Sequence, residues 1–123
     1  MKYLILISAN PEGAARFAAM EHDERYAMTA GYRELDAELA RTGEKITSAS
    51  LQGPDAGVRL SVADGKVVAT DGPFAETKEF LAGFYFVECD GIERAIELAS
   101  RMPEVEWGSV EIRPVRDLSG LGL

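Results

Sequence analysis

Residues 81 to 113, LAGFYFVECDGIERAIELASRMPEVEWGSVEIR, decide the fold. The first nine of these residues form an apolar and aromatic run, which is typical of a strand. The apolar residues of the middle part recur at helical spacing, and Pro103 marks the end of the predicted helix. A short apolar run over 109–113 predicts a further strand. The segment therefore predicts a β-α-β unit.

The N-terminal part of the chain predicts a second unit with the same order of elements. Residues 2–8 are almost continuously apolar and read as a strand, and a short helix or ordered loop over 12–20 follows. A longer amphipathic helix is predicted from about residue 23 to 42, ended by Gly43. A possible strand over 46–51 completes the unit.

A hairpin separates these two units. Asp64-Gly65 is a two-residue turn signal, and the residues on each side, 58–62 and 66–70, have the composition of strands. When the hairpin is set aside, the order is β-α-β followed by β-α-β. The sequence therefore predicts an α+β fold of the ferredoxin-like type with an extra β-hairpin.

Two helices can cover only one face of such a sheet. We expect the other face to carry apolar side chains from Tyr3, Ile5, Phe84 or Phe86. An apolar face of this size needs cover in a small protein. The sequence therefore predicts a homodimer in which the two sheets stack.

Composition and charge restrict the class of protein. The chain has 123 residues and a formal charge of −8, with 46% hydrophobic residues. We expect one globular domain over 1–116 and a short mobile tail over 117–123. The negative charge disfavours direct nucleic-acid binding. The apolar runs are too short for a signal peptide or a membrane span, so a cytoplasmic protein is expected.

The single cysteine and the single histidine argue against a metal site. Cys89 excludes an internal disulfide and is interpreted as a small buried residue. His22 has no second histidine or cysteine at ligand spacing, and the acidic residues around it are interpreted as a solvated face. We expect neither a metal ion nor a cofactor.

A ten-residue run, TDGPFAETKE over residues 70–79, points to a family. Together with LAGFY over 81–85, GSVEIRPV over 108–115 and the opening MKYL, it resembles the DGPF-domain branch of the YCII-related proteins. The resemblance covers nearly the whole chain. It implies a dimeric ferredoxin-like α+β barrel, a bacterial cytoplasmic protein and genes for extracytoplasmic-function sigma factors nearby. It implies no single reaction.

Some YCII-related proteins are thought to use a His-Asp pair, and one relative is a dehydrochlorinating enzyme. Counting along this chain places Tyr32 at the position of the family histidine and Met102 at that of the aspartate. Tyrosine holds its proton to about pH 10, and methionine has no proton to give. We therefore expect no dehydrochlorinase activity, and whether the protein is an enzyme stays open.

The candidate ligand-binding residues are Asp71, Arg113, Tyr32 and His22. Asp71 ends a strand where the sheet meets its loops, and Arg113 would need a carboxylate or a ligand if it pointed inward. The first functional hypothesis is a dimeric small-molecule-binding module with a cleft near Asp71. Glu76 and Lys78 follow the turn, and they belong either to the rim of this cleft or to a surface ion pair. The alternative is a non-enzymatic accessory protein that acts with a sigma factor.

Overall fold

The structure, a computed structural model, describes residues 1–73 and 78–123. Glu76, one of the candidates for the rim of the cleft, lies outside the described residues. The elements in chain order are β1 (Lys2–Ala9), α1 (Pro11–Ala19), α2 (His22–Met28), α3 (Ala30–Thr42), β2 (Lys45–Ser50), a 3-10 turn (Pro54–Ala56), β3 (Val58–Ala63), β4 (Lys66–Asp71), β5 (Phe80–Glu88), α4 (Ile92–Ala99), α5 (Glu104–Trp107), β6 (Ser109–Pro114) and a 3-10 turn (Ser119–Leu121).

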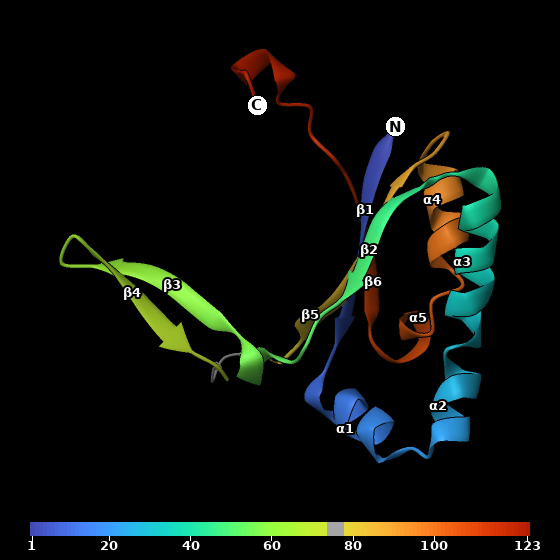
Figure 1. The fold of residues 1–123 in the computed structure, drawn as a ribbon, viewed down its shortest axis with the longest axis horizontal. Helices are drawn as coiled ribbons and strands as arrows, with labels where there is room; N and C mark the ends of the chain where they lie inside the picture. The colour runs from blue at the N-terminus through green and yellow to red at the C-terminus, as the bar shows by residue number, and fades with distance from the viewer. Residues whose placement is uncertain (74–77) are drawn as a thin grey trace.

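Four of these strands form one antiparallel sheet in the order β2-β5-β1-β6. In order of appearance these are the second, third, first and fourth strands, and this is the ferredoxin-like arrangement. The helices lie on one face of the sheet, and β3 and β4 form a separate hairpin that projects from the other side (Figure 1). The predicted fold and the extra hairpin are therefore confirmed.

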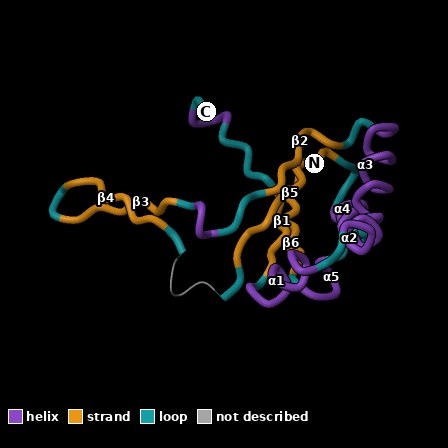
Figure 2. The backbone as a smooth tube through the Cα atoms, turned by 60° about the horizontal axis from the view of Figure 1, so that its bottom comes forward, coloured by secondary structure: helices purple, strands orange, loops and turns teal. Residues whose placement is uncertain are grey.

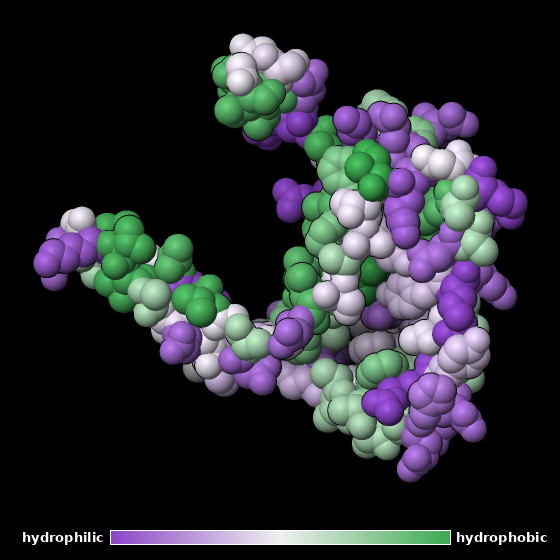
Figure 3. Space-filling view, viewed as in Figure 1, coloured by the Kyte–Doolittle hydropathy of each residue, from purple (hydrophilic) through white to green (hydrophobic). Residues whose placement is uncertain are grey.

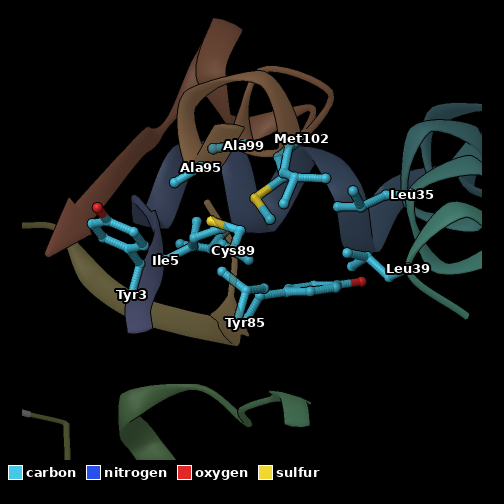
Figure 4. Packing of buried hydrophobic residues seen from close by; sticks show 12 residues of the cluster. Tyr3, Ile5, Leu35, Leu39, Tyr85, Cys89, Ala95, Ala99 and Met102 are labelled. Carbon is cyan, nitrogen blue, oxygen red and sulfur yellow. The ribbon is translucent and has the colours of Figure 1, made fainter. Parts of the chain in front are cut away.

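The alternation of side chains along β1 sets the two faces of the sheet. Tyr3, Ile5, Ile7 and Ala9 point toward the helices and are buried, Ile5 completely. Tyr3, Ile5 and Ile7 pack with residues of β5, α3 and α4 in one hydrophobic core (Figure 4). The sequence analysis placed Tyr3 and Ile5 on the uncovered face, and this prediction is wrong. The strand period of two assigns both to the helix side.

The opposite face, which we call the open face, is lined by apolar side chains of the two central strands. Cross-strand partners point to the same side of a sheet. Leu4 pairs with Phe86 and Leu6 pairs with Phe84, and all four are only partly buried. No described helix covers them (Figure 2).

The long helix predicted for residues 23–42 is interrupted. Helix α2 ends at Met28, and Thr29 caps the start of α3 with φ −91° and ψ 9°. The Thr29 hydroxyl donates to the Arg25 carbonyl at 2.9 Å, which competes with the helical bonding pattern. Gly31 lies close to the end of α4, since a Cβ there would stand 2.4 Å from the Arg101 carbonyl oxygen. The apolar spacing alone did not predict the interruption.

The helical layer is further joined by an ion-pair network around Arg94 of α4. The guanidinium donates to both carboxylate oxygens of Glu44, at 3.1 and 2.8 Å, and to Glu38 of α3 at 2.9 Å. Arg101 contacts the same Glu38 carboxylate at 3.0 Å. Hydrogen bonds from Arg101 and Arg94 lower the pKa of Glu38, and Arg94 lowers that of Glu44.

The chain's described helices include none long and apolar enough to cross a lipid bilayer. The C-terminal segment leaves the body after β6 and ends away from it (Figure 1). Its side chains Leu121 and Leu123 are exposed. Cys89 is buried, as expected, and its burial raises the pKa of the thiol.

We predict that Arg94→Gln lowers the melting temperature more than Arg41→Gln does. Arg94 loses three well-formed contacts, whereas Arg41 is exposed and lies 3.9 Å from one carboxylate. The carboxylate pKa values are lowered in the folded state, so this stabilisation is present above their unfolded values near pH 4.5 and is lost as the pH falls further. Thermal unfolding at neutral and acid pH checks both points. Equal melting temperatures for the two variants at neutral pH would contradict the network's role.

Candidate functional site

A cavity of about 670 Å³ lies between the helix side of the sheet and helices α1, α3 and α5. Its floor is formed by β1, β2 and β5, and its wall includes Phe17 of α1 and Trp107 of α5. Gly83 stands opposite Ile7 in the sheet, and a Cβ there would stand 2.8 Å from the Ala49 carbonyl oxygen of the neighbouring strand β2. The interruption at Thr29 lies on the wall, so α2 and α3 both contribute to it.

Two tyrosines form the polar part of this cavity. The rings of Tyr32 and Tyr85 stack with their centroids 6.1 Å apart and an interplanar angle of 14°. The Tyr32 hydroxyl donates to a carboxylate oxygen of Glu104, and the Tyr85 hydroxyl donates to Asp36 at 2.8 Å. One face of the cavity therefore consists of two aligned phenols, each bonded to a carboxylate.

Both tyrosines are held in the protonated form. Burial is the main cause that raises the pKa of Tyr32, followed by the hydrogen bond to Glu104 and its charge. Burial and the bond to Asp36 raise the pKa of Tyr85 in the same way. A phenol that keeps its proton cannot serve as a base near neutral pH. Its oxygen remains available as a hydrogen-bond acceptor for a bound molecule.

Trp107 of α5 contributes its ring to the cavity wall. Its indole Nε1 is buried and has no hydrogen-bond partner among residues 1–73 and 78–123. The ring is fixed by Gly13 of α1, because a Cβ at Gly13 would stand 2.6 Å from it. An unpaired buried donor is costly.

The charge of the cavity is negative. Glu104 is a titratable acid on its wall, and none of its described lining residues is a lysine, an arginine or a histidine. A cation near Tyr85 is Lys45, whose Nζ lies 5.8 Å from the centre of the Tyr85 ring and 3.6 Å from Asp36. That lysine is already paired with a carboxylate. An anionic ligand would therefore meet an uncompensated negative charge.

The structure brings one of the four predicted residues to this cavity, namely Tyr32. Asp71 is exposed at the end of β4 and is not among the lining residues. Arg113 points to the open face beside Leu4, is exposed, and lies 3.8 Å from Glu111. His22 is exposed at the start of α2, where it faces Asp23 and Tyr26. Asp71 and Arg113 therefore do not form a common site within this chain.

Glu104 is the functional candidate that the sequence did not reveal. The sequence places Met102, the residue before Pro103, at the position of the family aspartate, and this side chain is buried in the core. The acid that meets Tyr32 stands on the other side of that proline, in the first turn of α5. Pro103 followed by Glu104 is a sequence pattern that can start a helix. Only the fold shows that this short helix, α5, brings Glu104 to Tyr32 of α3.

The chain is similar in sequence and in structure to known proteins. A profile of the YCII-related domain matches residues 1–119. An uncharacterised protein of Rhizobium meliloti is 32% identical over 120 residues, which cover 94% of this chain and 92% of that protein. A structure of 5-chloro-2-hydroxyhydroquinone dehydrochlorinase from Burkholderia phenoliruptrix, in complex with 2,5-dihydroxybenzoquinone, is similar over 94% of each chain, with a TM-score of 0.49 and 12% identity.

We predict that Tyr32 does not ionise in the folded protein at about pH 11, where a free tyrosine is mostly ionised. The change in absorbance at 295 nm between about pH 8 and about pH 11 should be the same for the wild type and for Tyr32→Phe, and the two should differ once both are unfolded in guanidinium. Because the folded pKa is raised, the stabilisation by this phenol is present below about pH 10 and is lost as the pH rises further. A smaller absorbance change for the folded variant would show that Tyr32 titrates normally.

Proposed function

The chain belongs to the YCII-related family, and from this premise we propose that it binds a small molecule in the cavity beside Tyr32. The observation that carries the proposal is the cavity itself, which is apolar over most of its wall and has its polar groups gathered on one side. Such a distribution is typical of ligand sites, where an apolar wall gives affinity and a few polar groups set orientation.

The chemistry of the cavity selects a class of ligand. Two stacked phenols and the Trp107 ring offer aromatic surfaces, which favour a flat molecule. The Glu104 carboxylate, with no cation on the described wall, disfavours an anion. We therefore infer a planar ligand that is neutral or positively charged.

The site differs in place from the cleft that the sequence suggested. The cavity opens along the helix side of the sheet, and Asp71 takes no part in its lining. Leu51 and Gly53, which lead from β2 toward the hairpin, do line it. We propose that the ligand lies between Tyr32 and this connecting segment. No comparison supports the alternative of an accessory protein that acts with a sigma factor.

We further propose that the chain belongs to the DGPF branch of the family. The support is the run TDGPFAETKE over residues 70–79, in a chain whose family is the YCII-related domain. The central residues of that run, 74–77, lie outside the described part, so this assignment depends on the sequence. None of the described residues of this run lines the cavity.

We predict that a ligand found in a thermal-shift screen of metabolites loses its effect in Ala14→Trp. Ala14 lies on the cavity wall, so the larger side chain fills the space that the ligand needs. Ala15→Trp, an exposed position on the same helix outside the lining, is the matched control and should keep the shift. A ligand raises the melting temperature because it binds only the folded state. A shift that survives in Ala14→Trp, or a broad screen without any hit, would contradict the proposed site.

The charge preference is tested with three molecules that share one ring system: indole, tryptamine and indole-3-acetate. We predict that the anion binds at least about tenfold more weakly than the cation, because it approaches Glu104 in a site of low polarity. In Glu104→Gln, which keeps an acceptor for Tyr32, this difference should become small. Calorimetric titration measures the three affinities. Equal affinities of the wild type for cation and anion would show that Glu104 does not select by charge.

A further inference from the structure

Strand β2 places two serine hydroxyls on the cavity wall. Ser48 pairs with Tyr85 and Ser50 pairs with Gly83 in the neighbouring strand β5. Cross-strand partners share one side of a sheet. Tyr85 is on the helix side, so both serines face the helices, and both line the cavity. Neither hydroxyl has a hydrogen-bond partner among residues 1–73 and 78–123.

The other side-chain donors on the described part of the wall are already bonded or enclosed. The Thr29 hydroxyl donates to the Arg25 carbonyl, and the two tyrosine hydroxyls donate to carboxylates. The Trp107 Nε1 is fully buried, so a molecule in the cavity does not touch it. A serine hydroxyl donates one hydrogen bond and accepts two. The side-chain donors that this wall offers to a ligand are therefore those of Ser48 and Ser50.

The serines and Glu104 lie on opposite sides of the cavity. β2 is an edge strand of the sheet, whereas α5, which carries Glu104, packs against β1 and β6. Neighbouring strands are about 4.8 Å apart, so the step from β2 across β5 to β1 is roughly 10 Å. Gly83, which carries no side chain, lies between Ser50 and Ile7 in one row across the sheet. Figure 3, in which β2 faces the viewer, shows residues of intermediate hydropathy along this strand beside a recess toward the helices.

The two sides of the cavity favour different groups on a ligand. The serine hydroxyls donate to an acceptor, whereas the Glu104 carboxylate has lone pairs beyond the one that Tyr32 uses and accepts from an ammonium or N–H group. The stacked tyrosines stand between these two sides. Tyr85 is the neighbour of Ser48 in the sheet, and Tyr32 stacks on Tyr85. A flat molecule on these rings therefore meets a donor at one end and an acceptor at the other.

We propose that Ser48 and Ser50 determine which planar ligand the cavity prefers. The preferred ligand is a two-ring molecule about 10 Å long, with a hydrogen-bond acceptor at the β2 end and an amine or N–H group at the Glu104 end. This inference rests on the proposed function, because it concerns a ligand of the same cavity. The net contribution of one hydrogen bond is modest, so the serines set orientation and selectivity more than total affinity.

The test compares two tryptamines of similar shape, 5-carboxamidotryptamine and 5-methyltryptamine, by calorimetric titration. Of their two ring substituents, only the carboxamide brings an acceptor to the end opposite the ammonium group. The wild type should bind the carboxamide at least about threefold more tightly, and the double variant Ser48→Ala, Ser50→Ala should lose this preference. Thr47→Ala is the matched control, because it removes a hydroxyl from the opposite face of the same strand and should keep the preference.

A second comparison tests whether the two ends act separately. The double serine variant should still bind tryptamine more tightly than indole-3-acetate, and Glu104→Gln should still prefer the carboxamide. Circular dichroism checks the fold of each variant. If the double variant unfolds, Ser48→Ala and Ser50→Ala are measured singly, and each should reduce the preference.

The outcomes separate this inference from the proposed function on which it rests. Suppose that the tryptamines bind the wild type, that Ala14→Trp abolishes their binding, and that the serine variants keep the carboxamide preference. The cavity then remains a ligand site, but the role of the serines is wrong. A wild type without any preference for the carboxamide leads to the same conclusion. If none of the tryptamines binds, both proposals fail.

Discussion

Strand β1 is the constraint on which the rest of the structure depends. It lies between β5 and β6 at the centre of the sheet, and every second side chain enters the core beneath the helices. Because the period of a strand is two, the remaining side chains must form the opposite face, where Leu4 and Leu6 meet Phe86 and Phe84. One strand therefore determines both the covered core and the apolar surface left without cover.

The cavity arises from the way in which the helical layer meets this sheet. A straight helix over residues 23–42 would leave one continuous wall, but the break at Thr29 divides it into two short helices. Helix α1 and the single turn of α5 then close the space from other sides, with Trp107 resting on Gly13. The polar pair Tyr32–Glu104 forms where α3 and α5 face each other, on a wall that is otherwise largely apolar. A structure that brings elements together in this way can bind a ligand without any motif of adjacent residues.

The sequence predicted the fold far better than the site. Strand periodicity, the Asp64-Gly65 turn and the helix stop at Gly43 are local signals, and each was confirmed. The site depends on pairs that are distant in sequence: Tyr32 and Glu104 are separated by 72 positions. The faces of the sheet likewise depend on packing, since the apolar character of Tyr3 and Ile5 does not tell which face is covered, and both lie on the helix side. Local patterns predict elements, whereas the site depends on how those elements pack.

The segment after β2 belongs to two parts of the molecule at once. Leu51 and Gly53 line the cavity, and the hairpin begins directly after them, with Gly53 accepting a hydrogen bond from Ala56 at its base. A molecule that orders this segment in the cavity therefore also orders the base of the hairpin. Thermodynamic linkage then requires reciprocity: whatever holds the hairpin in place changes the affinity of the cavity for its ligand by the same factor by which the ligand favours that position of the hairpin.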